Sequence, residues 1–196
     1  MYRSAGWIAE AVSGTLNGDD RQVVMNRVVT DSRSASAGSA YVARIGEATD
    51  GHDYVKQAVD NGAVALIVEH LVDVPPSVAQ IVVEDSTYAL GRLAHAHLED
   101  LRAHFGLDVI AMTGSAGKTT TKDLLFQIMS TDAPSVAPQL SFNNEVGLPL
   151  TVLQADETTR HLVLEMGASG IGHIKYLTDI ASPDVAIELM VGHAHL

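Results

Sequence analysis

The spacing of hydrophobic residues predicts short, mixed elements in the first half of the chain. Apolar positions indicate helices at about 4–13 and 54–61, with strands near 23–25, 28–29, 40–43, 63–68 and 80–83. From Ser86 to Phe105 apolar residues recur at intervals of three, four and seven, which predicts a helix long enough to link two domains. His95 and His97 lie on different faces of this helix, so we expect solvated or core-edge histidines there and no metal pair.

The second half alternates strands and helices. Strands are predicted at 107–113, 161–166 and 184–191, and helices near 118–130, 147–154 and 171–181. This alternation is typical of a parallel α/β sheet. We therefore predict an α/β fold with a small mixed α/β domain over residues 1–106, linker helix included, followed over residues 107–196 by part of a mostly parallel, doubly wound sheet of P-loop type. Because the chain stops just after an apolar strand, we expect a fragment of a longer protein.

Composition narrows the class of protein. Hydrophobic residues make up 46% and charged residues 18%, which is typical of a globular chain. No apolar run has membrane-spanning length and no signal peptide opens the chain, so we expect a protein that is not embedded in a membrane. The absence of cysteine excludes disulfides and fits a reducing cytoplasm. A formal charge of −12 argues against a nucleic-acid surface.

The turn between Met112 and Lys118 is the strongest candidate for chemistry. It reads Thr113-Gly114-Ser115-Ala116-Gly117, between a strand and a helix. Such glycines let backbone N–H groups surround an anion, and the helix adds its positive end. Lys118 could then reach the β- and γ-phosphates of a nucleotide, and the Thr119 hydroxyl could ligate Mg²⁺. The general phosphate-loop pattern has glycine where this chain has Met112, so an ordinary glycine-rich turn with a surface lysine remains an alternative.

Further candidates lie beyond the strands that flank this turn. Glu165 ends a strand, and in open α/β sheets ligands bind at that end, where a carboxylate can ligate Mg²⁺. His195 ends the next strand and could reach the same metal. Asn143 and Asn144 precede a helix and could contact a nucleotide. The alternatives are a solvated glutamate, a structural histidine and a helix cap.

Two polar stretches in the first half, Thr30–Arg33 and Gly46–Asp53, are candidates for ligand binding. Arg33 could pair with an anionic ligand, and Ser32 and His52 could hydrogen-bond a base or a sugar. As isolated features, both stretches are also compatible with ordinary polar loops.

Together these stretches resemble the Mur ligases, the ATP-dependent amide-bond-forming enzymes of peptidoglycan synthesis. Residues 30–33 (TDSR) and 50–54 (DGHDY) are similar to their UDP-muramoyl-substrate domain, and residues 113–122 (TGSAGKTTTK) to the start of their ATPase domain. Residues 142–151 and 164–168 are similar to the members that add D-alanyl-D-alanine. The chain departs from the family at Ala116, His173, Glu188 and Met190, and Met190 puts one polar contact near the metal in doubt.

The resemblance implies a ligase with ATP and Mg²⁺ as cofactors, and with UDP-MurNAc-tripeptide and D-Ala-D-Ala as substrates. ATP would phosphorylate the tripeptide carboxylate, and the D-Ala-D-Ala amine would attack the acyl phosphate. We expect a cytoplasmic monomer. The implied nucleotide-binding residues are Thr113, Gly114, Ser115, Ala116, Gly117, Lys118, Thr119, Thr120, Asn143 and Asn144. The implied catalytic residues are Lys118, Glu165 and His195, the metal ligands Thr119, Glu165 and His195, and the substrate-binding residues Ser32, Arg33, Gly46, Asp50 and His52.

Two other functions stay open. One is a module that binds a UDP-sugar or nucleotide without chemistry, and the other is a related ligase of the folylpolyglutamate or diaminopimelate-adding type. The family also has a carboxyl-terminal ligase domain and a modified lysine, which we expect to be absent from these 196 residues. We therefore expect the fragment alone to show no ligase turnover.

Overall fold

Two compact units make up the chain. The computed structural model describes residues 1–46, 48–139 and 141–192, and contacts within the chain divide it into units of residues 1–93 and 94–196. This division lies inside helix α3 (Ser86–Phe105). The domain boundary predicted near residue 106, at the end of the same helix, stays a prediction about functional domains.

The first unit is built on a five-stranded mixed sheet in the order β2-β7-β6-β5-β4. The β2–β7 pair is antiparallel and the other pairs are parallel. The sheet strands are β2 (Thr15–Asn17), β4 (Val28–Val29), β5 (Ser39–Val42), β6 (Ala63–Val68) and β7 (Ala79–Val82). A separate antiparallel pair consists of β1 (Arg3–Ser4) and β3 (Val23–Val24). Strand β6 is apolar along its whole length, as expected for a strand covered on both faces.

Short helices pack against this sheet. Helix α1 (Ala5–Val12) begins where the Ser4 hydroxyl accepts a hydrogen bond from the Trp7 amide at 3.2 Å, which satisfies one free donor of the first turn. Helix α2 (Val55–Asp60) packs on β6. Two 3-10 turns, Ser32–Ser34 and Gly51–Tyr54, stand in the polar stretches that the sequence singled out.

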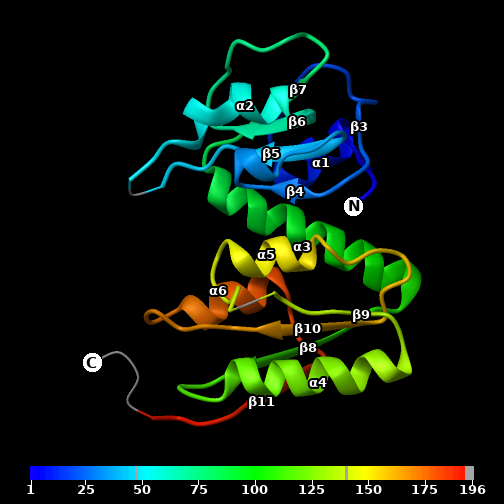
Figure 1. Ribbon diagram of the computed structural model, residues 1–196, viewed down its shortest axis with the longest axis vertical. Helices are drawn as coiled ribbons and strands as arrows, with labels where there is room; N and C mark the ends of the chain where they lie inside the picture. Colours follow the sequence, from blue (N-terminus) through cyan, green and yellow to red (C-terminus); the bar gives the residue numbers. More distant parts are fainter. Residues whose placement is uncertain (47, 140, 193–196) are drawn as a thin grey trace. The chain divides into compact units, whose positions relative to one another are not determined.

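The second unit contains a four-stranded parallel sheet in the order β11-β8-β10-β9. Its strands are β8 (Asp108–Thr113), β9 (Ser135–Val136), β10 (His161–Glu165) and β11 (Val185–Glu188). Helix α4 (Lys118–Asp132) covers one face, and α5 (Gly147–Val152) and α6 (His173–Ile180) cover the other (Figure 1). Glu165 pairs with Met112, and Glu188 with Thr113. The carboxyl ends of these strands therefore lie at the same sheet edge.

The predicted fold class is confirmed, and several element bounds differ. Helix α3 has the predicted bounds, but β2 and β9 were not predicted because two or three residues do not establish a periodic pattern. The strand predicted over 184–191 ends at Glu188, after which the Met190 carbonyl accepts hydrogen bonds from Ser115. On α3, His95 and His97 contact the carbonyls of Ile180 and Ala155.

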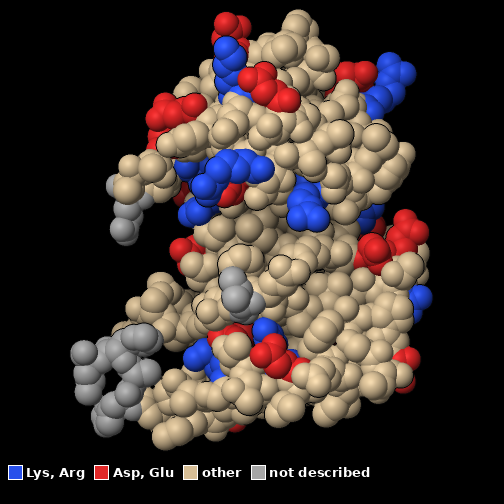
Figure 2. Space-filling model, in the orientation of Figure 1, with Lys and Arg blue, Asp and Glu red and all other residues tan. Residues whose placement is uncertain are grey.

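The surface carries both signs of charge despite the formal net charge of −12. Figure 2 shows one face, on which Lys and Arg side chains lie among Asp and Glu side chains in each unit. In the part of the chain that the structure describes, no helix combines the length and the apolar character that crossing a membrane requires.

Candidate functional site

The turn after β8 connects this strand to α4 through two glycines with positive φ. Gly114 has a φ of +146° and Gly117 a φ of +85°, a region that L-residues with side chains rarely adopt. A side chain on Gly114 would also approach Leu189 and Met190 within 3.1 Å of their nearest atoms. Because the turn is compact, α4 begins at Lys118 with its free amide groups at the sheet edge.

Lys118 lies over this turn. Its Nζ donates a hydrogen bond to the Gly114 carbonyl at 2.6 Å, so the ammonium group is held close to the backbone amides. Lys118 lines an open cleft of about 650 Å³ at the carboxyl ends of the strands. This cleft combines a lysine, a glycine turn and a helix amino terminus, which is the combination that binds phosphate groups.

Glu165 is the buried carboxylate beside the cleft. It is 2% exposed, and its two oxygens accept hydrogen bonds from different elements. The Thr119 hydroxyl donates to Oε2 at 3.0 Å, and the Asn143 amide donates to Oε1 at 2.8 Å. The Asn143 carbonyl in turn accepts from the Gly167 amide at 2.8 Å. The carboxylate is therefore held in a fixed orientation at the end of β10.

This donor set fits a magnesium ion that is shared with phosphate groups. Thr119 and Glu165 supply a hydroxyl and a carboxylate, the hard oxygen ligands that Mg²⁺ prefers. Among the described residues no three His, Cys, Asp or Glu side chains form a metal-binding group. Mg²⁺ commonly uses one or two carboxylates and completes its shell with waters and substrate phosphates. His195, the third predicted ligand, lies outside the described residues.

The cleft brings together several residues predicted from the sequence. Predicted residues that line it are Thr113, Gly114, Ser115, Lys118, Asn143 and Asn144. Four other predicted residues are exposed and are not among the lining residues: Ala116 and Gly117 on the turn, and Thr119 and Thr120 at the start of α4. Met190, which the resemblance placed near the metal, also lines the cleft, as do residues that no site prediction named: Glu145, Gly167, Ala168, Ser169, Glu188, Val191 and Gly192. Most of them follow the ends of β10 and β11, so the position of the strand ends could have identified them.

The first unit has a pocket of its own, of about 550 Å³. Its lining residues are Thr30, Asp31, Ser32, Arg33, Tyr41, Arg44, Gly46, Thr49, Gly51, Tyr54 and Gln57. Three predicted substrate-binding residues, Ser32, Arg33 and Gly46, therefore share one pocket. The other two, Asp50 and His52, are not among the lining residues.

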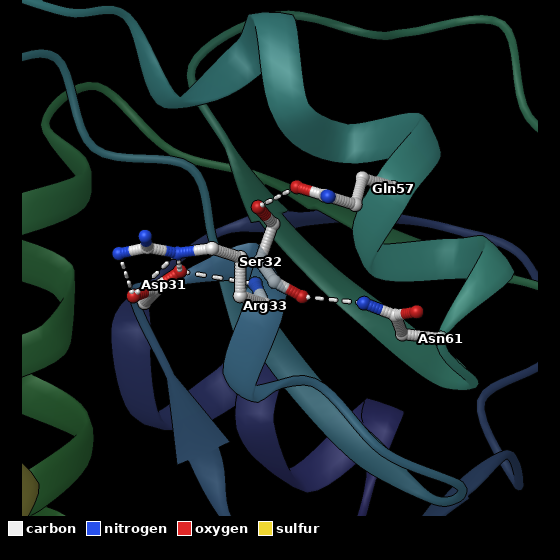
Figure 3. Close-up of polar contacts among 5 residues, drawn as sticks. All are labelled: Asp31, Ser32, Arg33, Gln57 and Asn61. Carbon is white, nitrogen blue, oxygen red and sulfur yellow. Dashed lines mark hydrogen bonds and ion pairs between the residues drawn. The ribbon is translucent and has the colours of Figure 1, made fainter.

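Figure 3 shows how the residues at one side of this pocket hold each other. The Arg33 guanidinium donates to both Asp31 oxygens, with Nε–Oδ1 at 2.9 Å and Nη2–Oδ2 at 2.7 Å. This contact lowers the pKa of Asp31 and raises that of Arg33. The Ser32 hydroxyl donates to Gln57 Oε1 at 2.6 Å, and the Asn61 amide donates to the Ser32 carbonyl at 3.0 Å. Arg33 is therefore oriented by a carboxylate that partly offsets its charge.

Arg44 is a second cation of the pocket and lies outside the sequence motifs that predicted the site. Its Nε donates to Thr87 Oγ1 at 3.0 Å, and no carboxylate within the described ranges forms an ion pair with it. Tyr41, which also lines the pocket, donates from its hydroxyl to the Gly51 carbonyl at 2.9 Å. Burial raises the pKa of Tyr41 to about 12, so it remains a neutral donor. Arg44 thus brings to the pocket a guanidinium group whose charge is not offset by an ion pair with any carboxylate of the described residues.

Asp50 and His52 fix the loop that closes the pocket. The His52 ring, 5% exposed, contacts Asp50 Oδ1 through Nδ1 at 2.6 Å and accepts from the Glu69 amide at Nε2 at 2.9 Å. It also stacks on His70, with ring centroids 4.2 Å apart. Both ring nitrogens therefore have protein partners, and direct ligand contact by His52 stays a prediction.

Acid is expected to destabilise the first unit through Asp50. Hydrogen bonds from the backbone amide and the ring of His52 lower the pKa of Asp50 below its ordinary value of 3.8. In the pH range between the two pKa values, the carboxylate stays ionised in the folded state but is protonated in the unfolded chain. Its contribution to the free energy of unfolding is therefore present above the ordinary pKa and is lost as the pH falls through the folded pKa. In urea titrations between about pH 5 and pH 3, Asp50→Asn should lose less stability than the parent. An equal loss in both proteins would contradict this role.

The chain matches two domain families over most of its length. Residues 112–196 match the Mur ligase middle domain, and residues 25–102 match the Mur ligase family, catalytic domain. The UDP-N-acetylmuramoyl-tripeptide--D-alanyl-D-alanine ligase of Bacillus subtilis (strain 168) is 41% identical, over 100% of this chain and 42% of the relative. The same-named protein of Mycobacterium bovis is 39% identical, over 96% of this chain and 41% of the relative.

Solved structures agree with these matches. A crystal structure of MurF from Acinetobacter baumannii has a TM-score of 0.90 and 37% identity, covering 100% of this chain and 42% of the other. MurF ligase from Thermotoga maritima in complex with ADP has a TM-score of 0.76 and 38% identity, covering 88% of this chain and 39% of the other. The chain therefore spans about two fifths of the length of these relatives. Because both halves of the chain match Mur ligase domains, and because the glycine turn at residues 113–117 lies in the matched middle domain, the chain belongs to the Mur ligase family.

Proposed function

We propose that this chain supplies the UDP-muramoyl-peptide site and the ATP site of a ligase that joins D-Ala-D-Ala to UDP-MurNAc-tripeptide. The observation that carries the proposal is the cleft where Lys118 lies over the glycine turn and Thr119 contacts the buried Glu165. The names of the relatives and the ADP in the Thermotoga maritima structure support it.

ATP would bind in the cleft of the second unit. The backbone amides of the turn and the start of α4 would hold the phosphates, and Lys118 would move from the Gly114 carbonyl to a phosphate oxygen. Thr119 and Glu165 would hold Mg²⁺, which supplies charge neutralisation at the β- and γ-phosphates. His195 remains part of the proposed metal set.

The UDP end of the muramoyl tripeptide would bind in the first unit. Arg44 and Arg33 line that pocket, where guanidinium groups suit a diphosphate because their planar forks can donate two hydrogen bonds to one anion. Ser32 is held by Gln57 and Asn61 at the same wall. Asp50 and His52 would act by shaping the loop, in addition to any contact with the ligand.

The proposed reaction activates a carboxylate. The terminal carboxylate of the tripeptide attacks the γ-phosphorus of ATP, which gives an acyl phosphate and ADP. The D-Ala-D-Ala amine then attacks the acyl carbon, an amide forms and phosphate leaves. The chain's own groups position the phosphates and stabilise charge, chiefly through Lys118 and the turn amides. No side chain in this scheme forms a covalent intermediate.

Calorimetry with the two ligands taken separately tests the proposal. We expect UDP-MurNAc-tripeptide and Mg-ADP each to bind at one site, and each to bind in the presence of the other, because the two pockets are lined by different units. Failure of Mg-ADP to bind would remove the nucleotide site. Equal binding of unrelated UDP-sugars without the peptide would favour the binding-module alternative.

The lack of turnover by these 196 residues alone stays a prediction. ADP release that depends on both UDP-MurNAc-tripeptide and D-Ala-D-Ala would contradict it. A panel of acceptor amino acids and dipeptides, tested with the longer protein, distinguishes the D-Ala-D-Ala ligase from a folylpolyglutamate or diaminopimelate-adding type. We also propose a cytoplasmic monomer, and light scattering tests the oligomeric state.

A further inference from the structure

Lys122 is a charged side chain buried one helical turn after Lys118. The residue is 3% exposed, although an ammonium group is costly to bury unless it is paired and hydrogen-bonded. Its Nζ donates to the Pro138 carbonyl at 2.9 Å and lies 2.8 Å from Asp123 Oδ1. Lys122 is not among the residues that line the nucleotide cleft, so any influence on a ligand there has to pass through its neighbours.

The Pro138 carbonyl belongs to the segment that leads from β9 to α5 and carries Asn143. Asn143 donates to Glu165 Oε1 at 2.8 Å, while Thr119 of α4 donates to the other oxygen at 3.0 Å. Helix α4 therefore contacts both this carboxylate and the segment that carries Asn143. Thr119 contacts the carboxylate directly, and Lys122 holds the segment from which Asn143 contacts it.

We infer that Lys122 is a positioning residue for the magnesium and nucleotide site. By holding the Pro138 carbonyl, it fixes the segment from which Asn143 orients Glu165. The inference rests on the proposed function, because it assigns Lys122 a role in the same site. A lysine that only fills the core would predict a different result, since apolar replacement of a buried charged group is often neutral or stabilising.

The test replaces Lys122 with methionine, which keeps an unbranched apolar stem and removes the donor. Partners that orient metal ligands typically change metal affinity by roughly 10–100-fold when they are mutated, so we expect magnesium-dependent ADP affinity to fall about tenfold. ADP affinity without magnesium should not change. The matched control is Lys175→Met on α6, where the lysine side chain is 77% exposed and pairs with Asp179. This control should bind as the parent does.

A double-mutant cycle with Asn143→Ala tests whether Lys122 affects Glu165 through Asn143. If Lys122 acts through Asn143, the double variant should lose little more magnesium-dependent affinity than Asn143→Ala alone. Amide hydrogen exchange over residues 141–148 should also rise in Lys122→Met and not in Lys175→Met. The inference would be overturned if the losses of magnesium-dependent affinity in the two single variants multiplied in the double variant, or if Lys122→Met left hydrogen exchange over residues 141–148 unchanged.

Two further variants keep the test decisive. Lys122→Arg retains a charged donor and should recover most of the lost affinity. If Lys122→Met does not fold, the shorter Lys122→Gln takes its place in the same cycle, and a folded Gln variant with parental magnesium dependence would refute the role. If the parent itself does not bind Mg-ADP, the proposed function fails and the inference fails with it. If the parent binds and the folded Lys122 variants match it, only the inference fails.

Discussion

Replacing Lys118 with alanine is expected to weaken ADP and ATP binding by about 100-fold. The Lys118 ammonium lies over the phosphate turn, 2.6 Å from the Gly114 carbonyl, and is the lysine that lines the cleft. Hydrogen bonds to charged groups contribute roughly 1.5–3 kcal/mol, and each 1.4 kcal/mol corresponds to about tenfold in affinity. Isothermal titration of the parent and the variant with Mg-ADP measures the loss.

The same variant should bind UDP-MurNAc-tripeptide as the parent does, because the pocket of the first unit contains no residue of the phosphate turn. Lys175→Ala removes an exposed lysine of the same unit and serves as the control for net charge. If Lys118→Ala weakened both ligands equally, two independent sites could not be maintained. If it weakened neither, the turn would be an ordinary connection between β8 and α4.

Replacing Glu165 with glutamine is expected to lower magnesium-dependent ADP affinity by at least the roughly 10–100-fold that loss of a residue orienting a metal ligand typically costs, because Glu165 is proposed to hold the ion directly. Glutamine has nearly the same shape, so it leaves no cavity at this buried position. Its amide can still hydrogen-bond both Thr119 and Asn143, because a hydroxyl accepts as well as donates. What the variant loses is the negative charge that a cation requires.

A magnesium titration at fixed ADP concentration measures this effect, with thermal unfolding as the check on the fold. Glu157→Gln, at an exposed position of the same unit, is the matched control. Parental magnesium dependence in a folded Glu165→Gln protein would mean that the carboxylate does not hold the cation. A large drop in melting temperature would show instead that Glu165 chiefly stabilises the core.

Most of the fold could be predicted from the sequence because its longer elements carry clear periodic patterns. Helix α3 and strand β6 have the predicted bounds, and the family predicted from short motifs is confirmed by the matches over both halves. Strands β2 and β9 have only three and two residues, and form because neighbouring strands offer hydrogen bonds to them. Such pairing is a tertiary effect that local sequence does not encode.

The residues of the candidate sites also fall into two groups, those that sequence motifs indicated and those that only the fold brings into the pockets. Lys118 and Arg33, which the sequence motifs named, line the two pockets, and their binding roles stay predictions. Arg44 and Ser169 were not named, because their place in a pocket depends on where a loop passes after a strand ends. The buried contacts of His52 could not be predicted from the sequence either, because its ring accepts a hydrogen bond from the amide of Glu69, which is distant along the chain.

Helix α3 limits how this protein can be cut for separate study. A truncation after Leu93 would cut α3 after about two turns and leave the carbonyl groups of its last turn without the amide partners that they have in the whole helix. Extending the piece to Phe105 would keep the helix whole but expose Leu98 and Leu101, which are buried in the intact chain. A soluble excised first unit therefore needs the full helix together with polar replacements at these two leucines.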